Sequence, residues 1–190
     1  YTKWILYQFA NSMNNLHLTN SLTNKKEIFN PINKEKVSLY ACGPTVYDSP
    51  HVGNARALVV FDLLYRVLIE LYGEKKVTYV RNITDIDDKI IEASKIKKID
   101  ISDLTKTVNE KFHKDYKVLF CLNPTQEPRA TDHVDDMINM TKKIIEKNAA
   151  YEKQGHVVFA VSSFKKYGKL SNKNLDDLKV GARVEVSKLK

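Results

Sequence analysis

The clearest hydrophobic pattern in the chain predicts a long helix over residues 55–72. Apolar side chains recur there every three or four positions, which is the spacing of a core-facing helical stripe. Further apolar residues at Val59, Val60 and Leu63 widen this stripe, so we expect the helix to be largely buried. Gly73 follows directly and is a typical helix stop.

Short segments rich in β-forming residues lie on both sides of this helix. Residues 37–42 are apolar and run into Gly43 and Pro44, and residues 77–81 have a similar composition. Parallel strands need a crossover connection, which is usually a helix. The order strand, helix, strand therefore predicts one parallel crossover unit of an α/β fold.

The rest of the chain alternates further helices with turns and short strands. Helical patterns occupy residues 89–97, 102–119 and 131–149, with Ser102 and Thr131 as candidate amino-terminal caps. The remaining predicted elements are strands at 26–29, 156–161 and 184–186, and a short helix over 171–178.

Composition indicates a folded protein with an excess of positive charge. Of the 190 residues, 43% are hydrophobic and 28% are charged, which is typical of globular rather than disordered chains. The net charge of +8 permits a polyanionic partner such as RNA, but scattered lysines also fit a general lysine bias. Two cysteines do not suggest a disulfide framework, no apolar run is long enough to span a bilayer, and we expect a cytoplasmic protein.

The segment 40–56, which reads YACGPTVYDSPHVGNAR, carries the clearest chemical signal. It ends a predicted strand, turns, and opens the long helix, whose first amides favour anions such as nucleotide phosphates. There His51 can donate a hydrogen bond to a phosphate, Gly53 lets a flat base approach the backbone, and Asn54 adds a neutral donor. The alternative is an exposed helix start with an incidental histidine, but its place between a strand and a buried helix favours function.

Several of these segments resemble one enzyme family. CGPTVYD followed by HVGNAR resembles the first signature of class I aminoacyl-tRNA synthetases, in the form found in cysteinyl-tRNA synthetases. The segments YVRNITDIDDKII at 79–91, EPRATDH at 127–133 and GARVEV at 181–186 match that family in the same order. The general motif has a second histidine where this chain has Asn54, which is a familiar variant in the family.

The resemblance implies the fold, the reaction and the partners. It implies a Rossmann-like catalytic domain, with an N-terminal extension at 1–25, the first half of the domain with its parallel sheet at 26–120, and an inserted α+β connective region at 121–190. It also implies that ATP activates L-cysteine to cysteinyl-adenylate, with Mg²⁺ accompanying ATP, and that the cysteinyl group is transferred to tRNA(Cys). We expect a monomer in which His51 and Asn54 are catalytic, and in which ATP binds His51, Gly53 and Asn54.

Cys42 is the candidate metal ligand. The resemblance implies that Cys42 is one ligand of a Zn²⁺ ion that binds the substrate thiolate, and that Gly43, Thr45 and Thr84 contact the substrate cysteine. Zinc favours sulfur, so direct coordination would distinguish cysteine from serine. The alternative is a small buried residue at a strand end. The family's other zinc ligands come from a region beyond residue 190, and Cys121 is not assigned to the metal.

Two polar clusters are open to structural and functional interpretations. Asp85, Asp87 and Asp88 suggest either a Mg²⁺ cluster or helix capping, and we favour capping for Asp87 and Asp88 and leave Asp85 undecided. We expect Glu127 and Arg129 to form a structural ion pair, with contacts near the substrate or the tRNA end as a second interpretation.

Other functions also fit the sequence. A related ligase would join cysteine to an amino sugar by the same adenylation chemistry, and a fragment without catalytic activity would bind RNA or a protein. The second class I signature, a lysine-rich loop, is not found in the 190 residues. This span therefore resembles only the front part of such an enzyme, and we expect it to be inactive by itself.

Overall fold

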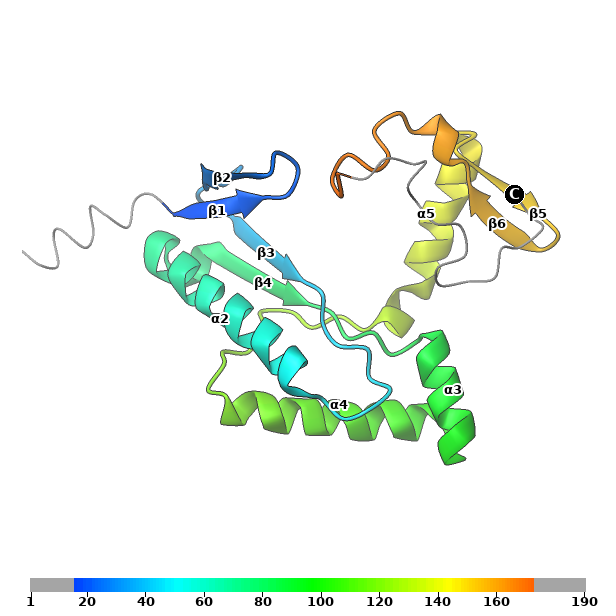
Figure 1. Cartoon of the computed structure of the whole chain (residues 1–190), viewed down its shortest axis with the longest axis horizontal. Helices are drawn as coiled ribbons and strands as arrows, with labels where there is room; N and C mark the ends of the chain where they lie inside the picture. Colours follow the sequence, from blue (N-terminus) through cyan, green and yellow to red (C-terminus); the bar gives the residue numbers. More distant parts are fainter. Residues whose placement is uncertain (1–15, 173–190) are drawn as a thin grey trace, which may run out of the picture. The chain divides into compact units, whose positions relative to one another are not determined.

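The computed structural model describes residues 16–172 (Figure 1). These residues belong to two compact units, and each is described by itself. One unit is Asn30–Val134, and the described part of the other consists of residues 16–29 and 135–172. The domain boundary that the sequence suggested near residue 120 stays a prediction.

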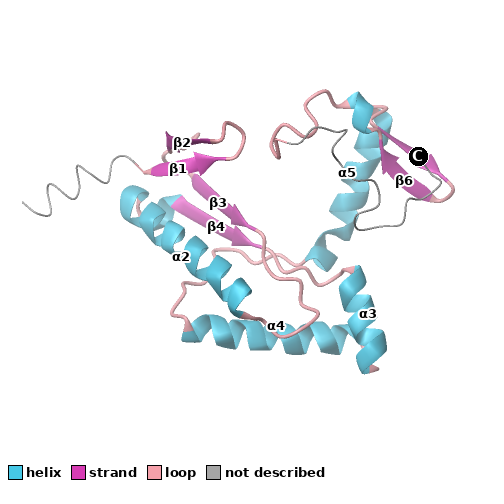
Figure 2. Ribbon diagram, viewed as in Figure 1, coloured by secondary structure: helices cyan, strands magenta, loops and turns pink. Residues whose placement is uncertain are grey.

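A parallel strand pair with a crossover helix forms the framework of the Asn30–Val134 unit (Figure 2). Strand β3 (Val37–Ala41) pairs with β4 (Val77–Arg81) in parallel, from Val37 opposite Val77 to Ala41 opposite Arg81. Helix α2 (Val52–Tyr72) and the short turn η1 (Glu74–Lys76) connect them. This confirms the predicted crossover, and Gly73 ends α2 with a φ of 91°, a value that favours glycine.

On the other side of β4, single parallel bridges rather than a full strand join β4 and the loop that follows it to residues 126–129. Val80 bridges Gln126 and Ile83 bridges Arg129. Among residues 16–172, β3 is hydrogen-bonded as a strand to β4 alone. The sheet of this unit therefore has one edge covered by an irregular segment and one edge, that of β3, without a strand partner in the described part of the chain.

Two further helices follow β4. These are α3 (Asp88–Lys97) and α4 (Ile101–Val118). Asp87 caps α3 by accepting a hydrogen bond from the amide of Lys89 at 2.9 Å, which confirms its predicted role. The expected cap of the next helix is wrong, because Asp100 accepts from the amide of Ser102 at 2.8 Å and Ser102 lies inside the first turn of α4.

The core lies beneath the loops that follow the two strands. It combines side chains from those loops with side chains from α2, α3 and α4: Val46, Leu58, Ile83, Ile90, Leu104, Val108, Phe112 and Tyr116. Because all three helices meet there, the loops rest on a packed base, which restricts their motion.

Helix α2 is less buried than its sequence predicted. Leu58 and Leu68 are buried, but Val59, Val60 and Leu63 are 45%, 56% and 63% exposed. A helix that packs against one layer buries only one stripe, and no described element of this unit covers the second apolar face. The expectation of a largely buried helix was therefore wrong for this part of the chain.

The other unit contains two antiparallel hairpins and a helix. Its elements are β1 (His17–Asn20), β2 (Lys25–Ile28), α5 (Val134–Glu146), β5 (Ala150–Lys153), β6 (His156–Phe159) and the turn η3 (Val161–Ser163). The β5–β6 turn contains Gln154 and Gly155, both with positive φ, as a type I′ hairpin turn requires. Strands β1 and β5 were not predicted, and the strand expected over 156–161 is shorter.

Three further predictions have separate outcomes. The helix expected over 131–149 begins with a 3₁₀ turn, η2 (Ala130–His133), and then continues as α5 to Glu146. The predicted strand at 184–186 and most of the predicted helix at 171–178 lie outside the described residues. No helix within residues 16–172 has both the length and the apolar character needed to cross a membrane.

Candidate functional site

The loops that leave β3 and β4 are joined to each other at the carboxyl end of the sheet. Thr45 and Thr84 form a parallel bridge, in which the amide of Val46 donates to Thr84 O at 3.1 Å and the amide of Thr84 donates to Pro44 O at 3.0 Å. Ligands of open α/β sheets bind outside the carboxyl ends of the strands. Two predicted substrate contacts, Thr45 and Thr84, therefore lie side by side where such a ligand would bind.

Gly43 makes this junction possible because it lies against the backbone of the second loop. A Cβ atom at Gly43 would lie 1.5 Å from the carbonyl oxygen of Asn82, which is far inside any non-bonded contact. The amide of Gly43 donates to Asn82 Oδ1 at 3.0 Å, and Asn82 Nδ2 donates to Thr84 Oγ1 at 3.1 Å. The glycine is required for this close approach.

His51 and Asn54 form a reciprocal cap at the start of α2. His51 Nδ1 accepts a hydrogen bond from the amide of Gly53 at 3.0 Å, and Asn54 Oδ1 accepts from the amide of His51 at 3.0 Å. Because Nδ1 is an acceptor, the N–H of the neutral ring is on Nε2, which is left to donate elsewhere. The side chain of His51 is exposed, so a ligand can reach that donor.

Gly53 allows the imidazole ring to occupy this position. A Cβ atom at Gly53 would lie 2.8 Å from His51 Cε1 and 3.0 Å from His51 Nδ1. The structure thus gives a second reason for a glycine at position 53. The first reason was the predicted approach of a flat base to its backbone. The role of Gly53 in ATP binding stays a prediction.

A polar pocket of ≈ 260 Å³ lies beside this cap. The loop residues 43–51 line it together with Asn54, Val108 and Phe112. Of the predicted site residues, Gly43, Thr45, His51 and Asn54 line the pocket, whereas Cys42, Gly53 and Thr84 adjoin residues that line it or are bonded to them.

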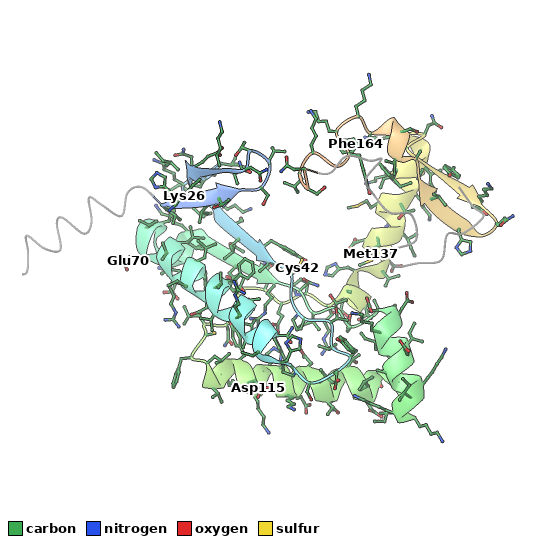
Figure 3. All side chains as sticks on the ribbon, in the orientation of Figure 1. Lys26, Cys42, Glu70, Asp115, Met137 and Phe164 are labelled. Carbon is green, nitrogen blue, oxygen red and sulfur yellow. The ribbon has the colours of Figure 1, made fainter. Side chains whose placement is uncertain are left out.

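Cys42 follows the last residue of β3, and its side chain is exposed (Figure 3). Along residues 16–172, no three His, Cys, Asp or Glu side chains gather closely enough to hold a metal ion. A structural or substrate-binding zinc site needs at least three protein ligands. The described residues therefore offer one accessible sulfur and do not by themselves form a zinc site.

Cys121 is less accessible than Cys42. It is partly buried against the core, its thiol lies 3.8 Å from Leu119 O, and burial raises the pKa of that thiol. A raised pKa lowers the fraction of thiolate, which is the form that reacts and binds metal. Cys121 is therefore a packing residue.

Asp85 has a structural role. Its buried carboxylate accepts hydrogen bonds from the amide of Thr131 at 3.0 Å and from Thr131 Oγ1 at 2.7 Å. Both oxygens are thus occupied by one residue of the EPRATDH segment, which argues against a Mg²⁺ ligand. Thr131 consequently does not cap the helix that follows it, as the sequence had suggested.

The expected ion pair between Glu127 and Arg129 is wrong. Glu127 instead binds Arg81, with Arg81 Nη2 and Nε donating to its Oε1 at 2.5 and 3.1 Å, and it binds His113 Nε2 through Oε2 at 2.6 Å. Arg81 is only 1% exposed and therefore needs a charged partner. Burial opposes the charge of Arg81, but the hydrogen bond with Glu127 helps to raise its pKa.

This buried ion pair also supports one wall of the pocket. The guanidinium carbon of Arg81 lies 4.3 Å from the ring centre of Tyr116 and 5.2 Å from that of Phe112, which lines the pocket. Sequence reasoning missed Arg81, although one signal was available. It shares the inward-facing parity of Val77 and Tyr79 on β4, where a charged residue implies a buried partner.

Comparison with known proteins now adds to this geometry. Residues 28–190 match the sequence model of a family described as tRNA synthetases class I (C) catalytic domain. The chain is 57% identical over 172 residues to a protein named cysteine–tRNA ligase from Pelagibacter ubique, and this alignment covers 90% of the chain and 38% of that protein. Proteins of the same name from Rickettsia felis and Beijerinckia indica are 50% and 54% identical, each alignment covering 92% of the chain and 38% of the relative.

The chain thus spans well under half the length of the curated relatives that it matches. The match nevertheless includes both strands, the capped helix and the loops of the pocket. On this evidence the chain belongs to the family of class I tRNA synthetase (C) catalytic domains.

Proposed function

We propose that this chain is part of an enzyme that activates L-cysteine with ATP and transfers it to tRNA(Cys). The observation that carries the proposal is the cap of α2, which leaves His51 Nε2 free to donate beside a polar pocket at the carboxyl end of two parallel strands. The names of the relatives support cysteine as the amino acid.

In the proposed first step, a carboxylate oxygen of cysteine attacks the α-phosphorus of ATP. The bond to the leaving pyrophosphate breaks, and cysteinyl-adenylate forms. Negative charge grows on the phosphate oxygens, and a donor fixed in position before the reaction stabilises that charge without having to reorient. His51 Nε2 and the amides at the start of α2 are such donors.

In the proposed second step, a ribose hydroxyl at the end of the tRNA attacks the carbonyl carbon of the adenylate. An ester bond forms and AMP leaves. The residues described here would act in both steps mainly by positioning the nucleotide, because the junction between the two loops fixes Thr45, Thr84 and the cap in one place.

The fold of the longer protein and its cofactors belong to the same proposal. We infer that residues 26–120 form the first half of a Rossmann-like domain and that residues 121–190 begin the connective insertion, in a cytoplasmic enzyme. Cys42 would supply one sulfur ligand of a zinc ion whose other ligands lie outside the described residues, and Mg²⁺ would accompany ATP.

The test is cysteine-dependent exchange of pyrophosphate into ATP by the intact protein. His51→Asn keeps a side chain that can cap the helix but removes Nε2, so we expect the exchange rate to fall by about 10²-fold or more with little loss of stability. Ser38→Ala, on the exposed face of β3, is the control and should retain full activity. Exchange that does not depend on cysteine, or an unchanged rate in His51→Asn, would contradict the proposal.

A further inference from the structure

Three lysines contact three consecutive residues of the pocket loop. Lys111 Nζ donates to Ser49 Oγ at 2.9 Å, and Lys97 Nζ lies 3.4 Å from Asp48 Oδ1. Lys89 Nζ lies 5.4 Å from the ring centre of Tyr47. Lys89 and Lys97 belong to α3 and Lys111 belongs to α4, so two helices direct positive charge to one short loop.

The loop residues that these lysines contact also line the polar pocket. Tyr47, Asp48 and Ser49 form part of its wall, together with His51 and Asn54 of the α2 cap. The ammonium groups thus contact residues that line the pocket. Positive groups beside a polar pocket attract anionic ligands and raise their local concentration.

The ion pair between Lys97 and Asp48 is a weak one. Asp48 and Lys97 are 65% and 41% exposed, and an exposed pair at 3.4 Å contributes little to stability. The hydrogen bond from the amide of Ser49 is the largest cause of the lowered pKa of Asp48, followed by Lys97. The loop itself thus keeps the carboxylate of Asp48 charged. Lys97 can therefore leave this carboxylate and bind a stronger anion.

We propose that Lys97 and Lys111 form a phosphate-binding rim, in which Asp48 and Ser49 hold the two ammonium groups until a ligand phosphate replaces them. A phosphate carries more charge than one carboxylate and offers several acceptor oxygens to both ammonium groups. The proposed function supplies the source of the phosphate, and the assignment rests on it. The phosphate belongs either to the triphosphate of ATP or to the backbone of the tRNA.

The chain offers a matched control for this proposal. Lys95 on α3 and Lys106 on α4 are exposed and carry the same charge, and they lie about 160° and 140° around their helices from Lys97 and Lys111. The double variants K97A/K111A and K95A/K106A therefore remove equal charge from the same two helices. Any difference between them reports on position rather than on net charge.

The experiment measures dissociation constants of the intact protein for sodium tripolyphosphate, ATP and unacylated tRNA at fixed low salt. We expect K97A/K111A to weaken binding of at least one probe by roughly tenfold, and K95A/K106A to change it by less than about twofold. Loss confined to tripolyphosphate and ATP assigns the rim to the nucleotide, and loss confined to tRNA assigns it to the RNA backbone. Equal effects of the two double variants on all probes would overturn the proposal.

A third variant tests the exchange itself. Asp48→Asn removes the internal anion, so it should tighten binding of the affected probe by a few fold, in the opposite direction to K97A/K111A. Weaker binding would show that Asp48 does not compete with the ligand. Cysteine-dependent pyrophosphate exchange is measured on the same preparations, so the failure of the proposed function remains distinguishable from the failure of the rim.

Discussion

Replacing Gly43 with alanine should destabilise the Asn30–Val134 unit more than any single hydrogen bond could explain. The new Cβ would lie 1.5 Å from Asn82 O and 2.8 Å from Asn82 C, both of which are backbone atoms that cannot rotate away. The φ of Gly43 is not in the left-handed region, so the cost arises from this approach rather than from backbone strain. To accept the methyl group, the loops after β3 and β4 must separate by more than an ångström.

The size of the effect follows from the hydrogen bonds that this separation breaks. They are the bonds from Gly43 N to Asn82 Oδ1, from Val46 N to Thr84 O and from Thr84 N to Pro44 O. At about 1 kcal/mol for each, the loss is about 3 kcal/mol. For a unit of this size, that corresponds to a decrease in Tm of roughly 15 °C.

The measurement is urea unfolding of the intact protein, followed by a probe within the Asn30–Val134 unit. Tyrosine fluorescence, recorded as a function of urea concentration, includes the exposure of Tyr65, Tyr79 and Tyr116, which are buried in this unit. Ser38→Ala on β3 is the control, and its free energy of unfolding should stay within about 0.5 kcal/mol of the wild type. An equally small change for Gly43→Ala would show that the two loops do not meet as described.

Two further predictions concern the cap and the buried tyrosine. Gly53→Ala would place a methyl group 2.8 Å from His51 Cε1, so we expect the ring to be displaced. The pyrophosphate exchange rate should fall by at least about tenfold, and the free energy of unfolding should fall by about 1 kcal/mol. An exchange rate within twofold of the wild type would contradict the assigned cap. Burial raises the pKa of Tyr116 from 10.0 to about 12, so its contribution to stability is complete below pH 10 and is lost as the pH rises towards 12. Burial also raises the pKa of Tyr79, so titration of the folded protein followed at the tyrosinate absorbance should show more than one late-titrating tyrosine, of which Tyr116→Phe removes one. Ionisation of all tyrosines near pH 10 in the folded protein would refute this.

The crossover of strand, helix and strand was predictable because each of its signals is local. Helical periodicity placed α2, β-forming residues placed β3 and β4, and Gly73 marked the helix end. The cap of α2 was also within reach of the sequence, since His51 and Asn54 are three positions apart. Signals of this kind need no knowledge of distant segments.

The errors occurred where a residue's environment depends on a partner far along the chain. Glu127 was assigned to its neighbour Arg129, but it pairs with Arg81, 46 residues away, because a buried guanidinium competes more strongly than an exposed one. Asp85 was left undecided because its partner, Thr131, is equally distant. The burial of α2 was overestimated because periodicity identifies an apolar face without showing what covers it.

Within residues 16–172 one edge of β3 has no strand partner, and this has a practical consequence for handling this span of the protein. An unpaired strand edge offers a template to any other strand, and the exposed Val60 and Leu63 of α2 add an adhesive apolar surface to the same unit. The net charge of +8 makes copies repel one another, and added salt screens that repulsion within a Debye length of about 10 Å at 0.1 M. Dilute buffers of low ionic strength should therefore preserve single molecules, and concentrated salt should drive them together into sheets shared between copies.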